Sequence, residues 1–156
     1  MSISQGLEIR DGDPVRCQGG SSALNAAVLL ARFLNLFAAG DFDEMRLLFS
    51  SDATYRIADR EGHGPFWRGR SALLRNLQTI RQHMNGTVRI RSDIIANCCD
   101  TAICTWDLVN EDSNGTPYHN SGTLTAQVAH GVIVAVEEIL DLNVLTTLVG
   151  DLNSSI

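Results

Sequence analysis

The stretch TLTAQVAHGVIVAVEEIL, residues 123–140, decides the fold class of this chain. Leu124, Ala126 and Val128 alternate with polar residues, and a second apolar run follows His130-Gly131. A step of two between apolar residues is typical of β-strands, and a glycine-containing pair between two such runs predicts a tight antiparallel turn. Asn114-Gly115 marks another turn of this kind upstream. The predicted strands of this half span 87–96, 101–111, 117–129 and 132–141.

The first half of the chain has helical spacing instead. Apolar residues between Leu24 and Phe37 recur every three or four positions, which predicts a helix from about Ala23 to Gly40. Ser21 or Ser22 would cap its start. The other predicted elements are a helix over 42–49, a strand over 53–58, a loop over 59–69 and a helix over 71–84 that Ser71 caps.

This order of elements predicts an α+β fold. Three helices and a strand precede four strands joined by tight turns, so the helices should pack on one face of a curved, mainly antiparallel sheet. A chain of 156 residues suits one domain. We expect an N-terminal arm over 1–20, the domain over 21–150 and a C-terminal tail over 151–156.

Composition narrows the classes of partner. The net charge is −6, and no block of Lys or Arg stands out, so we expect neither nucleic acid nor a membrane surface as a partner. No apolar run approaches the ~20 residues of a membrane span, and the polar N-terminus lacks the apolar core of a signal peptide. These features predict a cytoplasmic protein. The four cysteines and four histidines have no metal-ligand spacing, so we expect free thiols and no metal site.

Several short runs, taken together, resemble a known superfamily. They are Phe37-Ala38-Ala39-Gly40-Asp41-Phe42-Asp43, Leu48-Phe49, Ser51-Asp52-Ala53-Thr54, Gly69-Arg70, and the C-terminal set Gly131-Val132-Ile133, Glu138, Asp141 and Leu145. Their order and spacing are similar to those of the SnoaL-like polyketide cyclases, whose superfamily includes ketosteroid isomerase and limonene epoxide hydrolase. The resemblance implies a cystatin-like, nuclear-transport-factor-like cone with a deep apolar pocket. It also implies a homodimer and chemistry that needs no cofactor.

The catalytic residues of that superfamily transfer only in part. On the ketosteroid isomerase pattern, Phe33, Ile57 and Thr123 occupy the three catalytic positions, so that machinery is absent.

On the epoxide hydrolase pattern, Asp107 and Glu138 match the two acids and Tyr55 matches the tyrosine. Thr105 stands in place of the arginine, and Ile57 in place of the asparagine. The cyclases also place a key acid at Glu138, and the nearest candidate for their catalytic histidine is His119.

The residues themselves also point to Glu138. In a regular strand Glu138 shares a face with Val134, Val136 and Leu140, so its carboxyl would be desolvated and its pKa raised. Such a group suits general acid–base catalysis. The alternative is that Glu137 points inward and Glu138 lies in solvent or an interface.

The other candidates depend on which strand faces the cavity. Asp107 shares a face with Thr105 and Val109; if that face lines the pocket, Asp107 and Glu138 could share a proton. The alternative is a surface aspartate. Tyr55 is either a hydrogen-bond donor to substrate or a half-buried aromatic on a strand.

On the predicted strand 117–129, the alternation of inward and outward side chains distinguishes His119 from its neighbours Tyr118 and Asn120. Leu124 and Ala126 favour Tyr118 and Asn120 as inward residues over His119, although a bulge near Gly122 would reverse this. His83 and His63 are weaker candidates for a catalytic histidine.

The predicted pocket lining completes the hypothesis. It comprises Phe33, Phe37, Leu77, Arg81, Tyr118, Asn120, Val136 and Leu140, with Trp67 over the mouth. We therefore predict a cofactor-free acid–base enzyme, namely a SnoaL-like cyclase, isomerase, dehydratase or epoxide hydrolase. Its substrate would be a hydrophobic polyketide- or terpenoid-like molecule of secondary metabolism. The alternative is a non-catalytic binding module or partner subunit of the same fold.

Overall fold

One twisted sheet organises the part of the chain that the computed structural model describes, residues 15–16, 25–98 and 100–150. The strand order is β1-β4-β5-β6-β7-β2-β3. The strands are β1 (Val15–Arg16), β2 (Phe49–Ala58), β3 (Phe66–Arg68), β4 (Met84–Cys98), β5 (Thr101–Asp112), β6 (Pro117–Ala129) and β7 (Val132–Leu140). The helices are α1 (Ala26–Ala39), α2 (Phe42–Arg46), α3 (Arg70–Gln82) and α4 (Leu142–Val149).

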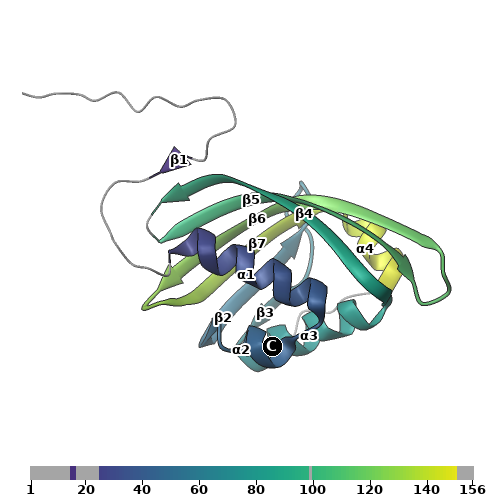
Figure 1. Ribbon diagram of the computed structural model, residues 1–156, viewed down its shortest axis with the longest axis horizontal. Helices are drawn as coiled ribbons and strands as arrows, with labels where there is room; N and C mark the ends of the chain where they lie inside the picture. The colour runs from purple at the N-terminus through teal and green to yellow at the C-terminus, as the bar shows by residue number, and fades with distance from the viewer. Residues whose placement is uncertain (1–14, 17–24, 99, 151–156) are drawn as a thin grey trace, which may run out of the picture.

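The sheet is mainly antiparallel, as the turn pattern predicts. β4, β5, β6 and β7 pair antiparallel in chain order, and β3 pairs antiparallel with β2. The two parallel pairs are β2 with β7 and β1 with β4. The sheet curves around α1, and α2 and α3 lie near the β2–β3 end (Figure 1). The α+β class is confirmed.

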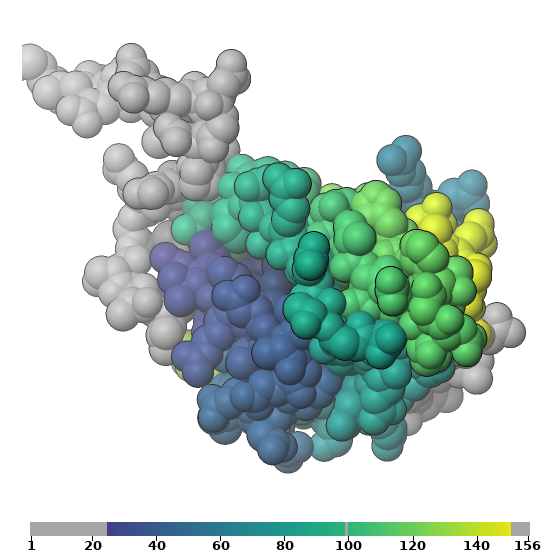
Figure 2. All heavy atoms as spheres, turned by 45° about the vertical axis from the view of Figure 1, so that its right-hand side comes forward, coloured from purple at the N-terminus to yellow at the C-terminus, as the bar shows by residue number. Residues whose placement is uncertain are grey.

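The helices close the curved sheet from one side. Helix α1 contacts β4, β5, β6 and β7, and α3 contacts β2, β3 and β4. In the space-filling view, α1 packs beside β4, and the yellow α4 lies against the green end of β6 (Figure 2). None of the described helices is long and apolar enough to cross a membrane.

Helix α1 carries much of the apolar core. Its buried residues are Ala26, Leu29, Leu30, Phe33, Leu34 and Phe37. The helix ends at Gly40, which adopts a left-handed conformation with φ 73° and donates its N–H to the carbonyls of Leu36 and Phe37. Its start differs from the prediction: Asn25, rather than Ser21 or Ser22, is the N-cap and accepts from the N–H of Val28 at 3.0 Å.

Three elements were absent from the sequence prediction, and the first of them, β1, lies in the expected N-terminal arm and pairs with β4. Strand β3 lies inside the predicted loop 59–69, and α4 follows β7 directly. Three residues are too few to show a period, and eight residues form too short a helix to be stable without packing. Both β3 and α4 are held by neighbours: β3 pairs with Thr54, Tyr55 and Arg56, while the Asp141 side chain caps α4.

The start of α3 also differs from the prediction. Gly69, without a side-chain hydrogen bond, precedes α3 where Ser71 was the predicted cap.

An irregularity in β7 sets the orientation of its second half. Val128 pairs with Ile133, but Gln127 pairs with Ala135, so Val134 is an extra residue. Ile133 and Val136 can therefore both be buried. From Val136 onward the alternation is regular.

Candidate active site

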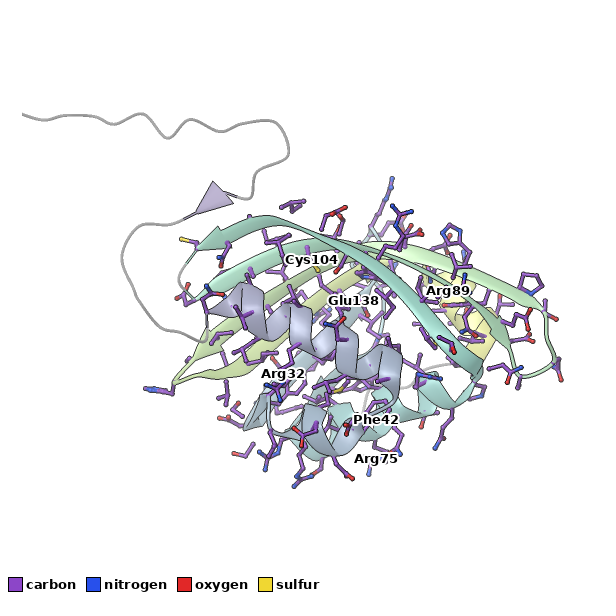
Figure 3. The ribbon with its side chains drawn as sticks, viewed as in Figure 1. Arg32, Phe42, Arg75, Arg89, Cys104 and Glu138 are labelled. Atoms are coloured by element: carbon purple, nitrogen blue, oxygen red, sulfur yellow. The ribbon has the colours of Figure 1, made fainter. Side chains whose placement is uncertain are left out.

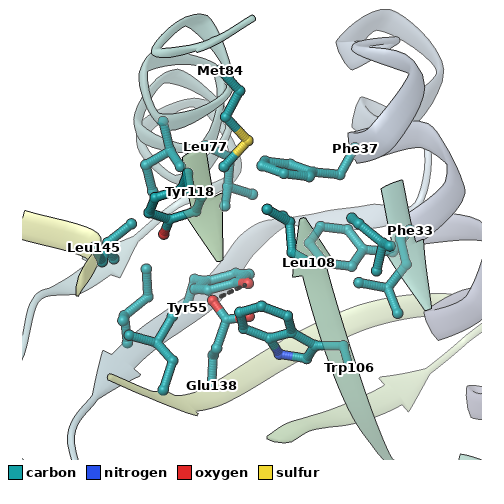
Figure 4. A pocket seen from close by; sticks show the side chains of 15 residues that line it. Phe33, Phe37, Tyr55, Leu77, Met84, Trp106, Leu108, Tyr118, Glu138 and Leu145 are labelled. Atoms are coloured by element: carbon teal, nitrogen blue, oxygen red, sulfur yellow. Dashed lines mark hydrogen bonds between the residues drawn. The ribbon is translucent and has the colours of Figure 1, made fainter. Parts of the chain in front are cut away.

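An apolar pocket lies between the concave face of the sheet and the helices (Figure 4). It has an empty volume of about 490 Å³, which includes the solvent at its opening, but the centre of a water molecule can occupy only about 50 Å³ of it. The pocket is therefore narrow. Its lining is Phe33, Leu34, Phe37, Tyr55, Ile57, Leu77, Ile80, Met84, Ile90, Trp106, Leu108, Tyr118, Glu138, Leu140 and Leu145.

Glu138 is the one carboxyl group in this lining. It is partly buried, while Glu137 beside it is exposed on the other face of β7. Figure 3 shows Glu138 in the interior between α1 and the sheet, whereas Arg75 lies at the edge of the molecule. Desolvation by the apolar surroundings raises the pKa of Glu138 to about 7, although the hydrogen bond from Tyr55 acts in the opposite direction. A carboxyl with this pKa can gain or lose a proton near neutral pH.

Tyr55 holds the Glu138 carboxyl from β2. Its hydroxyl donates to Oε1 of Glu138 at 3.2 Å. Burial, and then the charge of Glu138, raise the pKa of Tyr55 well above its usual value, so Tyr55 stays protonated. The ring packs against Trp67 with centroids 5.7 Å apart and against Phe33 at 6.1 Å.

Trp67 is not at the pocket mouth. It is completely buried on β3, opposite Tyr55 in the strand register, and it is not part of the lining. The expectation that it covers the opening is wrong because residues 66–68 form a strand rather than a loop. Trp67 instead supports the ring of Tyr55 from behind.

Tyr118 and Asn120 both point inward from β6, and the strand pairing is continuous through Gly122. Tyr118 lines the pocket (Figure 4). Asn120 is buried next to it but does not line the pocket. Its side-chain amide donates to the Tyr118 oxygen at 3.3 Å and to the Asp141 carbonyl at 3.2 Å.

Asp107 and His119 lie on the outer face of the sheet. Their side chains are 44% and 62% exposed, and they form a hydrogen bond of 2.6 Å between Oδ1 and Nε2. The inward residues of β5 are Trp106 and Leu108. The structure therefore contradicts the idea that Asp107 shares a proton with Glu138. It also separates His119 from the pocket.

The same parity corrects the family alignment. Thr105 is exposed on the outer side of β5, and Thr123 pairs with it across the outer side of β6. Neither position faces the pocket, so the ungapped register that placed Thr105 and Asp107 on catalytic positions does not hold.

Arg81 and Val136 are structural rather than pocket-lining. The Arg81 guanidinium donates to the carbonyls of Phe37 and Ala38 at 3.1 Å each, and to that of Gly86 at 3.2 Å. It thereby ties the end of α1 to the start of β4. Val136 is 2% exposed in the core. Phe33, Phe37, Leu77 and Leu140 do line the pocket.

Trp106 is the largest lining residue that the sequence prediction missed. The alternation of buried Ala102, Cys104, Trp106 and Leu108 was a usable signal for it. The indole Nε1 is buried without a hydrogen-bond partner. Gly122 makes room for the ring: a Cβ there would lie 2.9 Å from Cζ2 of Trp106 and would overlap the Ile139 carbonyl oxygen.

Other missed lining residues are Leu34, Ile57, Ile80, Met84, Ile90, Leu108 and Leu145. Leu145 belongs to α4, which the sequence pattern did not predict.

The cysteines differ from the expectation in one respect. Cys98 is disulfide-bonded, so the expectation of free thiols is wrong for that residue. Cys104 is free and buried, and desolvation together with the charge of Glu138 raises its pKa to about 11. It is therefore unsuited to act as a thiolate nucleophile. Within the described ranges, no group of three or more His, Cys, Asp or Glu residues could hold a metal ion.

Comparison with solved structures finds the same fold in proteins of low sequence identity. A candidate polyketide cyclase from Xanthomonas campestris pv. campestris matches with a TM-score of 0.67 at 21% identity, over 80% of this chain and 96% of that one. A candidate isomerase from Bacillus subtilis matches with a TM-score of 0.66 at 15% identity, over 83% and 96%. An NTF2-like protein of unknown function from Exiguobacterium sp. 255-15 has a TM-score of 0.60 at 21% identity, over 72% and 98%.

Comparison at the level of sequence identifies the family. No curated protein matches the chain. The family model described as "SnoaL-like domain" matches residues 30–136, which is well over half of the chain. This match shows that the chain, with its apolar pocket under the curved sheet, belongs to the SnoaL-like domain family.

Proposed function

We propose that this protein is a cofactor-free enzyme of the isomerase or cyclase type. In this proposal Glu138 removes a proton from an apolar carbonyl compound and later returns it. The observation that carries the proposal is the Glu138 carboxyl in an apolar pocket, with a pKa of about 7 and a hydrogen bond from Tyr55. A base whose pKa is close to the working pH is suited to proton transfer.

The proposed reaction moves a proton and an electron pair within the substrate and needs no redox partner. The Glu138 carboxylate takes a proton from a carbon next to a carbonyl group, and the C–H electron pair moves toward the carbonyl oxygen to form an enolate. Return of the proton to another carbon gives an isomer. Alternatively, the enolate carbon attacks a second carbonyl group within the same molecule: a C–C bond closes the ring, the π pair of that carbonyl moves to its oxygen, and the resulting alkoxide takes the proton from Glu138. Glu138 can serve as base in the first step and as acid in the second.

The pocket favours a flat, hydrophobic substrate of the polyketide or terpenoid kind. The support for this choice is the apolar lining and the narrow interior, in which the centre of a water molecule can occupy only about 50 Å³, so the pocket is a slot rather than a wide chamber. Epoxide hydrolysis by two acids receives less support, because Asp107 faces outward.

A generic proton-transfer probe tests Glu138 without knowledge of the natural substrate. 5-Nitrobenzisoxazole is flat and opens to a coloured phenolate when a base removes its ring proton. We expect wild-type protein to accelerate this opening with a rate that rises through a pH of about 7, and E138Q to abolish the acceleration. The matched control is E137Q, which removes a neighbouring carboxyl on the exposed face.

A second control is D107N, which should leave the rate unchanged because that carboxyl lies outside the pocket. Carbon-detected NMR titration of Glu138 should give a midpoint of about 7. Equal acceleration by E138Q and wild type, or a midpoint near 4.5, would refute the proposal and favour a non-catalytic binding module.

A further inference from the structure

Tyr118 has a hydroxyl proton that no group in the described part of the chain accepts. The hydroxyl oxygen accepts a hydrogen bond from Nδ2 of Asn120, and no acceptor for its own proton is present among those residues. The residue is 8% exposed and lines the pocket that holds Glu138. Figure 4 shows the hydroxyl pointing into the pocket between Leu145 and Tyr55.

The orientation of the Asn120 amide leaves no other arrangement. Its Oδ1 accepts from the backbone N–H of Ser121 at 2.9 Å, so the nitrogen end must face Tyr118 and the Asp141 carbonyl. Asn120 therefore presents a donor to Tyr118, and the Tyr118 proton must turn elsewhere. The two residues lie two positions apart on one strand face, which keeps their side chains adjacent.

Burial and nearby charge keep this proton in place. Desolvation is the largest cause that raises the pKa of Tyr118, the hydrogen bond from Asn120 opposes it, and the charges of Glu138 and Asp141 raise it further. Tyr118 is therefore a neutral donor at physiological pH. A buried donor without an acceptor favours a ligand that supplies one.

We propose that Tyr118, oriented by Asn120, donates a hydrogen bond to a substrate oxygen that gains negative charge when Glu138 removes a proton. This inference rests on the proposed function. It assigns Tyr118 as a catalytic residue and Asn120 as a positioning residue. It also restricts the substrate to compounds in which the reacting carbon and an acceptor oxygen are held together across the pocket. As the C–H electron pair moves toward that oxygen, the Tyr118 hydrogen bond strengthens, and no proton need leave Tyr118.

Binding of 4-nitrophenol at pH 6 tests the donor separately from proton transfer. At this pH Glu138 and 4-nitrophenol are both mostly neutral, and the phenol oxygen offers an acceptor for the Tyr118 proton. We expect Y118F to weaken 4-nitrophenol binding about tenfold or more. Nitrobenzene, which keeps the nitro group but lacks the phenol oxygen, should bind both proteins equally. E138Q should retain 4-nitrophenol binding while it loses the opening of 5-nitrobenzisoxazole, so the two proposals can fail independently.

The positioning role has its own readout. N120D keeps the oxygen that Ser121 needs but replaces the donor to Tyr118 with an acceptor, which should draw the Tyr118 proton away from the pocket. We expect N120D to weaken 4-nitrophenol binding like Y118F, with nitrobenzene binding retained as the check on folding. For 5-nitrobenzisoxazole, Y118F should lower kcat more than it raises KM, because the oxygen gains charge only as the ring opens. Equal 4-nitrophenol affinity in wild type and Y118F would overturn the inference.

Discussion

At the scale of single residues, the feature that matters most is one carboxyl group placed among apolar side chains. Glu138 is neutral in the folded protein up to a pH of about 7, but a glutamate in the unfolded chain ionises at about 4.5. Below pH 4.5 the group is protonated in both states and stability is unaffected. As the pH rises from 4.5 to 7, ionisation of the unfolded state lowers the free energy of unfolding, with a total loss of about 3 kcal/mol.

We therefore expect E138Q to gain stability relative to wild type across this window. The difference in the free energy of unfolding should grow by about 3 kcal/mol between pH 4.5 and pH 8, because the amide cannot ionise. Urea denaturation at several pH values measures it, with E137Q as the exposed control. A difference that does not change with pH would contradict a desolvated Glu138.

Tyr55 makes a second prediction at this scale. Its hydroxyl stabilises the charged form of Glu138, so the hydrogen bond lowers the pKa of that carboxyl. Y55F removes the donor with little change in shape. We expect the pKa of Glu138 to rise by about 1 and the pH–rate profile for 5-nitrobenzisoxazole to move upward with it. NMR titration of Glu138 in both proteins checks this, and a lower pKa in Y55F would disprove the role of Tyr55.

At the scale of elements, the pairing of β5, β6 and β7 depends on one missing side chain. Gly122 lies between Trp106 on β5 and Leu140 on β7 in the strand register. Its backbone needs no unusual conformation, but a Cβ at this position would lie 2.9 Å from the Trp106 ring and would overlap the Ile139 carbonyl oxygen.

We expect G122A to lower the free energy of unfolding by about 1–3 kcal/mol, since neither the paired strands nor the buried ring can move without loss elsewhere. Thermal and urea denaturation measure the change. S121A, an exposed substitution on the same strand, is the control and should have little effect. If G122A is as stable as S121A, the close packing of Trp106 against β6 is incorrect.

At the scale of the whole molecule, the outer face of the sheet is a separate surface from the pocket. It carries Asp107 and His119 together with two exposed apolar residues, Val109 at 51% and Ile139 at 47%. The homodimer that the sequence resemblance implies remains a prediction, and this face offers apolar area for it.

We expect wild-type protein to sediment as a dimer and I139K to shift it toward monomer, because a buried lysine without a partner is costly. L47K places the same charge on an exposed leucine at the end of α2 and should not change the sedimentation coefficient. A wild-type monomer, or equal behaviour of I139K and L47K, would rule out an outer-face dimer.

The sequence by itself determined what depends on local period. The alternation around His130-Gly131 predicted β6 and β7, Gly40 marked the end of α1, and Glu138 was singled out because it follows Val136 in steps of two. These features can be read from a few neighbouring residues, since pleat and helical turn repeat over short distances.

Only the tertiary structure decided which faces meet around the pocket. Asp107 points outward, because its strand presents Trp106 and Leu108 to the cavity, and Trp67 is buried because β3 pairs with β2. Helix α4 contributes Leu145 although it is too short to be recognised alone. Each of these outcomes depends on contacts between residues far apart in the chain, where strand register and packing outweigh local preference.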